Sequence, residues 1–152
     1  MFLVARGYRF LRYNEHKSET IRALILSAFF RYQMLYGKTR KLKNKFGIAG
    51  EESGLESLPR EYKYARKVAY AVNQVCSKTK WESKCLVRAL VAQRLLADKG
   101  IDSTLYLGCK ETEDHQIIAH AWIRCGSFFV SGGNGAADGY AIVEKFRARI
   151  ER

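Results

Sequence analysis

Apolar residues recur along this chain with two spacings, one typical of helices and one typical of strands. Helical spacing predicts three helices, over 19–36, over 60–77 and between Ser83 and Gly100, where Ser83 is expected to cap the start and Gly100 to end the helix. Strand-like apolar runs predict four strands, at 102–109, 116–125, 127–131 and 140–146. Short turns between these strands favour antiparallel pairing. The pattern therefore predicts an α+β fold, with a helical N-terminal segment followed by a central helix packed on a mainly antiparallel sheet.

The helix expected over 19–36 has one apolar face, made of Ile21, Leu24, Ile25, Ala28, Phe29, Tyr32 and Leu35. Ser18 is expected to cap its start and Gly37 to end it. Its longest uncharged run, from Ala23 to Phe30, is too short to span a bilayer. We expect this face to pack into the protein core, with contact to a membrane surface as the second alternative.

Charge divides the chain unevenly. The net charge is +12, and residues 1–47 carry eleven Lys or Arg against two Glu, which places +9 in the first third. This asymmetry indicates an acidic partner, such as nucleic acid, an anionic membrane surface or an acidic peptide, unless it is a solvated basic face. The only proline and three glycines fall within 47–59. We therefore expect a basic helical N-terminal segment at 1–50, a linker at 51–59 and one domain at 60–152.

The cysteines, at positions 76, 85, 109 and 125, form no CxxC pair, and no secretory signal precedes them. This favours reduced thiols in a cytoplasmic protein. Cysteine and histidine are not paired at ligand spacing, so we expect no metal and no cofactor. No nucleic-acid-binding signature accompanies the basic residues.

Cys85 and His120 form the best candidate pair for chemistry. Cys85 falls in the first turn of the central helix, where free backbone N–H groups and the helix dipole favour a thiolate, and Lys84 acts in the same direction. His16 lies in a charged stretch and His115 in a polar loop, whereas His120 is embedded in an apolar strand. Several Cys–His hydrolases use this order. Taken singly, each residue is more often an inert core residue.

Five short motifs have an order and spacing that resemble a known family. They are W-x-x-x-CL at 81–86, LL-x-x-x-GI at 95–101, LG at 107–108, AHAW at 119–122 and VSGG at 130–133. Residues 60–147 thereby resemble the leader-peptide protease of lasso-peptide biosynthesis, a papain/transglutaminase-like cysteine protease. The basic front segment ending in KFG is similar to that family's N-terminal region.

This resemblance implies a role in the maturation of a ribosomally made peptide antibiotic. The protein would remove the leader from a lasso-peptide precursor, and an asparagine-synthetase-like cyclase would then close the macrolactam ring. No leader-recognition domain precedes the front helix in this sequence. The resemblance therefore implies the split form, in which a separate protein recognises the leader.

The same resemblance implies Cys85 as nucleophile and His120 as general base. Relatives carry an aspartate about a dozen positions after the histidine, but here residues 131–134 read SGGN and no acid occurs before Asp138. The orienting group is therefore open, and we retain four candidates: Asn134, Asp138, Ser131 or a backbone carbonyl. Asn134 and Asp138 are equally compatible with plain turn residues.

The oxyanion candidates are the backbone N–H of Cys85 and the indole N–H of Trp81, while Trp122 would shield the pair from water. For Trp81 we favour an ordinary core role that anchors the helix, and core packing explains Trp122 equally well. Two other classes of function remain open in the sequence. One is a catalytically idle scaffold that binds a peptide or protein, and the other is a nucleic-acid-binding module that uses residues 1–47. A Cys–His pair can also catalyse acyl transfer to an amine, so the sequence leaves this reaction as a further alternative.

Overall fold

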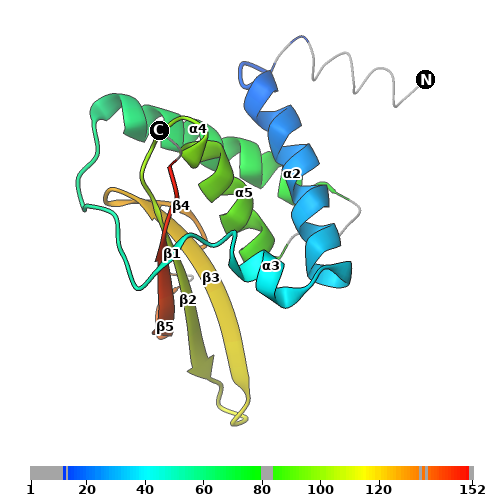
Figure 1. Ribbon diagram of the computed structural model, residues 1–152, viewed down its shortest axis with the longest axis vertical. Coiled ribbons are helices and arrows are strands. Elements are labelled where there is room, and N and C mark those ends of the chain that lie inside the picture. The colour runs from blue at the N-terminus through cyan, green and yellow to red at the C-terminus, as the bar shows by residue number, and fades with distance from the viewer. Residues whose placement is uncertain (1–11, 13, 80–83, 134, 136, 151–152) are drawn as a thin grey trace.

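The structure is a computed structural model that describes residues 12, 14–79, 84–133, 135 and 137–150. Four helices and five strands are assigned in it: α2 (Lys17–Tyr36), α3 (Thr39–Lys43), β1 (Ile48–Ala49), α4 (Pro59–Cys76), α5 (Cys85–Ala97), β2 (Thr104–Glu111), β3 (Ile117–Cys125), β4 (Phe128–Ser131) and β5 (Ala141–Arg147). The strands form one sheet in the order β1-β5-β2-β3-β4. Figure 1 shows α2, α4 and α5 gathered against one part of the sheet, while the β2–β3 hairpin extends beyond them.

Every strand pairing in the described sheet is antiparallel, so the predicted α+β class is confirmed. The helices at 60–77 and before Gly100 and the four predicted strands are also present, with shifts of a few residues at their ends. The short elements α3 and β1 were not predicted. Helical periodicity cannot show a five-residue helix, and alternation cannot show a two-residue strand.

The core lies between the helices and one face of the sheet. Val68, Val72 and Val75 recur at helical spacing on α4 and are buried, and α5 is buried along most of its length. The sheet contributes Leu105, Ala121, Ile123, Cys125, Val130 and Phe146 to the same cluster. We call this side of the sheet the inner face. Because side chains alternate along a strand, the neighbours of these residues point to the opposite side, the outer face.

The orientation predicted for α2 is wrong. Ile25, Tyr32 and Leu35, expected in the core, are 63%, 64% and 55% exposed. The buried positions are instead Glu19, Thr20, Ala23, Ser27 and Phe30. Periodicity identifies a face but not the direction in which it points. Here small side chains at Ala23 and Ser27 face α4 and α5, and small side chains allow helices to approach closely.

Ion pairs tie the inner side of α2 to the helices beneath it. The Glu19 carboxylate lies 3.2 Å from Lys67 Nζ of α4, and Arg22 pairs with Asp98 at the end of α5. Burial raises the pKa of Glu19, but bonds to its own backbone amide and to Lys67 outweigh burial and leave that pKa below its usual value. The predicted cap at Ser18 is also wrong, because the helix starts at Lys17 with His16 as its N-cap residue.

The ends of α5 fix where its side chains point. The helix starts at Cys85, with Lys84 as an extended N-cap residue, so Cys85 is its first residue rather than part of a turn begun at Ser83. Ser83 itself lies outside the described residues. At the other end, Gly100 has a φ of +68° and the Ile101 amide donates to the Leu96 carbonyl at 3.1 Å. The predicted terminating glycine is confirmed.

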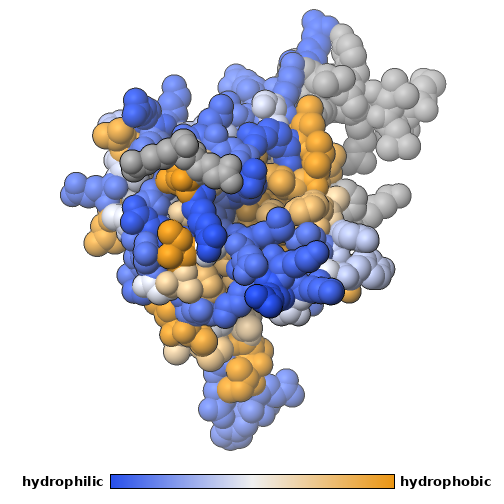
Figure 2. Space-filling view, in the orientation of Figure 1, coloured by the Kyte–Doolittle hydropathy of each residue, from blue (hydrophilic) through white to orange (hydrophobic). Residues whose placement is uncertain are grey.

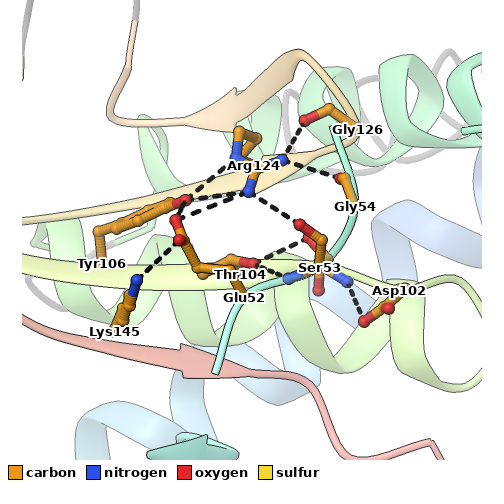
Figure 3. Close-up of polar contacts among 10 residues, drawn as sticks. Glu52, Ser53, Gly54, Asp102, Thr104, Tyr106, Arg124, Gly126 and Lys145 are labelled. Carbon is orange, nitrogen blue, oxygen red and sulfur yellow. Dashed lines mark hydrogen bonds and ion pairs between the residues drawn. The ribbon is translucent and has the colours of Figure 1, made fainter. Parts of the chain in front are cut away.

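Residues Glu52–Gly54 lie against the outer face, where Arg124 holds them (Figure 3). The guanidinium of Arg124, 6% exposed, donates to the carbonyls of Ser53 at 3.1 Å, Gly54 at 3.0 Å and Gly126 at 2.6 Å. It also donates to the Tyr106 hydroxyl, which in turn donates to Glu52. The expected division at 1–50, 51–59 and 60–152 remains a prediction. In the part of the chain described, no helix is long and apolar enough to cross a membrane.

Candidate active site

Cys85 lies at the N-terminus of the buried helix α5. The first bond within this helix joins the Arg88 amide to the Lys84 carbonyl, so the amides of Cys85, Leu86 and Val87 have no acceptor inside the helix. The Cys85 side chain is partly buried and packs against the core, and its thiol is free. The Cys85 thiol thus lies at the N-terminal end of α5, and the Cys85 amide has no acceptor within the helix.

His120 is held by a backbone carbonyl. Its Nε2 lies 2.7 Å from the carbonyl oxygen of Gly132. Because a carbonyl oxygen can only accept, Nε2 carries the hydrogen, and the neutral ring then has its lone pair on Nδ1. Among the described residues, Nδ1 has no hydrogen-bond partner. The ring is thus in the tautomer that can accept a proton at Nδ1.

Gly132 allows this contact because it is a glycine. Its φ is +71°, and a Cβ at this position would lie 2.5 Å from the Ala121 carbonyl oxygen and 3.2 Å from His120 Nε2. Any larger residue would therefore displace the carbonyl from the ring. A backbone carbonyl thus contacts the imidazole at Nε2. A backbone carbonyl was one of the four orienting candidates left open by the sequence, and its orienting role remains a prediction.

Aromatic rings stack around His120 on the outer face. The Trp122 ring is 5.8 Å from the imidazole and 5.5 Å from the Tyr106 ring, with interplanar angles of 23° and 13°. Tyr140 approaches the imidazole at 5.2 Å. Gly108, opposite His120 on β2, leaves room for this stack, since a Cβ there would come within 2.8 Å of the Trp122 ring. The stacked rings pack against the imidazole and restrain its plane.

The outer-face stack continues into the Arg124 contacts. Burial raises the pKa of Tyr106, and its bond to Glu52 raises it further, so the hydroxyl stays protonated. Hydrogen bonds from Lys145 and Tyr106 lower the pKa of Glu52, which therefore stays ionised. Figure 3 shows Tyr106 between Arg124 and Glu52. The Tyr106 ring stacks on Trp122, and Trp122 stacks on His120.

The other predicted site residues are distributed around this centre. Trp81 and Asn134 lie outside the described residues. Asp138 is exposed and its amide closes a turn onto the Gly135 carbonyl, while Ser131 is partly buried at the end of β4. Trp122 stacks on the His120 ring, and its shielding role remains a prediction. The roles of Asn134, Asp138, Ser131 and Trp81 remain predictions.

Cys85 comes from the helical layer and His120 from the outer face of the sheet. Within the described part of the chain, no hydrogen bond joins the Cys85 thiol to the imidazole. A pocket of about 310 Å³ is lined by neighbours of these two residues, namely Arg88, one turn after Cys85, and Gly132, whose carbonyl contacts His120. The rest of its wall comes from α4 and β4, including Asn73, Phe129 and Ser131.

Sequence reasoning missed several residues of this site. Gly132 and Gly108 were present in the VSGG and LG motifs, yet nothing in the sequence linked either glycine to His120. Tyr106, Tyr140 and Arg124 read as ordinary strand residues because their partners lie far away in the sequence. No group of three or more His, Cys, Asp or Glu side chains that could hold a metal occurs in the described ranges.

Comparison with known proteins supplies one match. Neither the curated proteins nor the solved structures contain a significant match to this chain. The sequence model of the transglutaminase-like superfamily, in contrast, matches residues 35–145, nearly three quarters of the chain. The matched range contains α5 with Cys85 and β3 with His120. The chain therefore belongs to the transglutaminase-like superfamily.

Proposed function

We propose that this protein is a cysteine peptidase that removes the leader from a lasso-peptide precursor. The observation that carries the proposal is the bond from His120 Nε2 to the Gly132 carbonyl, which leaves Nδ1 as the basic nitrogen. Cys85 at the start of α5 supplies the second half of the pair. The superfamily includes cysteine peptidases and transferases, which is consistent with this chemistry.

The reaction proceeds through an acyl-enzyme. The Cys85 thiolate attacks the carbonyl carbon of the scissile peptide bond, and the oxyanion that forms is stabilised by the free amides at the start of α5. The imidazolium Nδ1–H of His120 protonates the leaving amine as the carbon–nitrogen bond breaks. Water then loses a proton to Nδ1 and attacks the thioester, which releases the acid and regenerates the thiolate–imidazolium pair.

The leader as substrate rests on the sequence resemblance. The same resemblance supplies the partners in this proposal, a separate leader-recognition protein and an asparagine-synthetase-like cyclase. The pocket beside Gly132 is partly polar and carries Arg88 and Asn73 in its wall. It suits a polar or acidic side chain of the substrate.

One observation favours a second candidate, a scaffold of the same fold that binds a peptide without cutting it. Cys85 and His120 are not hydrogen-bonded to each other, and the imidazole lies on the outer face. In a working peptidase, the thiol and Nδ1 must reach each other in solution before substrate binds, and their hydrogen bond then tightens in the complex. In the idle scaffold they would stay apart.

Mass spectrometry of a leader-containing precursor separates the two candidates. The precursor is incubated with the protein and the recognition partner, and wild type is compared with Cys85→Ala and His120→Ala. Cys109→Ala is the matched control, because Cys109 is also a free, partly buried thiol. The peptidase predicts one cut that both site variants abolish and the control retains. Cutting by Cys85→Ala would remove the mechanism, and no cutting by wild type would favour the scaffold.

A further inference from the structure

The outer side of α2 is an apolar surface that no described part of the chain covers. Its most exposed apolar residues recur every three or four positions, and we call them the α2 stripe: Ile21, Ile25, Phe29, Tyr32 and Tyr36, which are 42–75% exposed. Leu24 and Leu35 lie beside them, 43% and 55% exposed. Figure 2 shows apolar atoms along α2, next to hydrophilic residues. A contiguous patch of this kind indicates an interaction surface.

A cleft opens beside the stripe. It has a volume of about 480 Å³, and its apolar lining consists of Ile25, Leu26, Phe29 and Phe30. Its polar lining consists of Arg22, Lys45, Arg94 and Asp98. A second cavity of about 390 Å³ shares four of these residues and continues toward Leu90 and Ala148. The surface is therefore hollowed and can receive side chains from a partner.

The cleft has an excess of positive charge. Asp98 accepts from Arg94 at 2.9 Å and pairs with Arg22, so the single carboxylate is shared by two cations. Lys45 lies over the Phe29 ring, with Nζ 5.3 Å from its centroid. The helix α3 adds Arg40 and further lysines next to the end of α2. A ligand for this surface must place carboxylates next to large apolar side chains.

We propose that the α2 stripe and its cleft bind one amphipathic helix of another protein, with Asp or Glu flanking its apolar face. The stripe runs over sixteen residues, or about 22 Å of helix, which matches a partner helix of about four turns. A second copy of this chain fits poorly, because both surfaces would carry the same positive rim. Residues 1–13 contain three arginines and no acid, so they cannot supply the carboxylates.

A flat bilayer surface also fits less well than a helix. An anionic membrane would satisfy the charge and contact the stripe, but it would leave a cleft of this size unfilled. The proposal concerns a surface separate from Cys85 and His120. It therefore stands or falls independently of the proposed peptidase activity.

The test is a selection from a peptide library in which the charge of the ligand is not fixed in advance. The full-length protein is used to select from a displayed library of helical peptides of about 18 residues, with Leu fixed on one face. The other positions are drawn from Glu, Lys, Gln and Ala. The proposal predicts that enriched peptides are strongly acidic and that their affinity falls as the salt concentration rises.

Matched variants show whether binding uses the α2 stripe. Ile25→Glu and Val143→Glu each add one negative charge at an aliphatic side chain of similar exposure, 63% and 67%, but Val143 lies on β5. We expect Ile25→Glu to weaken the enriched peptides at least about tenfold and Val143→Glu less than about twofold. Enrichment of neutral or basic peptides, enrichment of none, or equal binding by Ile25→Glu would overturn the proposal.

Two further measurements identify the other occupants. Vesicles with about 30% anionic phospholipid that bind wild type but not Ile25→Glu, in the absence of any enriched peptide, would assign the surface to a membrane. Sedimentation of a dimer that Ile25→Glu dissociates would assign it to a second copy of the chain. Either result contradicts the proposal.

Discussion

The two faces of the sheet use the same strands for different purposes. On the inner face, Leu105, Ile123 and Phe146 are fully buried against the helices and carry no polar group. On the outer face, the alternate positions hold Tyr106, His120, Trp122 and Arg124, which contact each other or backbone carbonyls. The inner face supplies apolar burial, and the outer face supplies charge, hydrogen bonds and the candidate base. The face to which a residue of β3 points therefore predicts whether its substitution changes core stability or the candidate site.

The largest expected effect comes from Arg124, which joins the outer face to residues 52–54. Arg124→Met should lower the free energy of unfolding by about 3–5 kcal/mol, because it leaves buried carbonyls without donors. Urea denaturation measures this change. Lys145→Met is the control, since Lys145 bonds the same Glu52 from an exposed site and should cost less than about 1 kcal/mol. Equal losses of unfolding free energy in the two variants would show that the Arg124 hydrogen bonds stabilise the fold no more than one exposed ion pair does.

Gly132→Ala tests the link between the outer face and the candidate chemistry. We expect it to cost about 2–3 kcal/mol of stability and, in the peptidase, at least about a hundredfold in rate, because the carbonyl leaves His120. Gly100→Ala is a matched control with φ +68° and open space around the Cβ position. It should show backbone strain alone, with full cutting rate. A Gly132→Ala variant that cuts normally would contradict the positioning role of the Gly132 carbonyl.

The inner face should respond in stability only. Ile123→Val removes one buried methyl group and should cost about 1 kcal/mol, measured by thermal or urea unfolding. The rate of precursor cutting should stay unchanged, since Ile123 points away from His120. A clear loss of rate without further loss of stability would show that the two faces are coupled.

The smallest effect concerns α2, where a charged residue lies inside and apolar residues lie outside. The pKa of Glu19 is lower in the folded protein than its ordinary value, so its contribution is present above the ordinary value near 4.5 and disappears as pH falls through the folded pKa. Wild type should therefore exceed Glu19→Gln by about 1 kcal/mol at pH 7 and by little at low pH. Unfolding curves at several pH values measure the difference. A difference that is constant with pH would contradict an ionised Glu19.

The sequence predicted the fold better than it predicted orientation. Strong periodicity located the long helices and the strands, because burial imposes a period of 3.6 or 2 on long elements. The same periodicity predicted the wrong buried face for α2, because the small residues Ala23 and Ser27 decide which face packs against the other helices. It also misplaced the start of α5, since Lys84 rather than Ser83 precedes the first helical residue.

The candidate site was predictable only in part. Cys85 and His120 stand out by residue type and local context. The Gly132 carbonyl could be anticipated as a class of partner but not as a residue, because a backbone acceptor leaves no trace in side-chain chemistry. Arg124 appeared to be an ordinary strand cation because its acceptors at Ser53 and Gly54 are about seventy residues away. Contacts across such separations depend on the fold.

The central claim is that Cys85 is an activated nucleophile paired with His120, and thiol alkylation tests it without a known substrate. Iodoacetamide labelling at pH 7, read cysteine by cysteine with mass spectrometry, compares Cys85 with the partly buried Cys109 and with Cys125, whose pKa is raised by burial. The account predicts labelling of Cys85 at least about ten times faster than Cys109 in wild type, and a rate close to that of Cys109 in His120→Ala. Equal labelling of Cys85 and Cys109, or a Cys85 rate unaffected by His120→Ala, would contradict the pairing and with it the proposed peptidase.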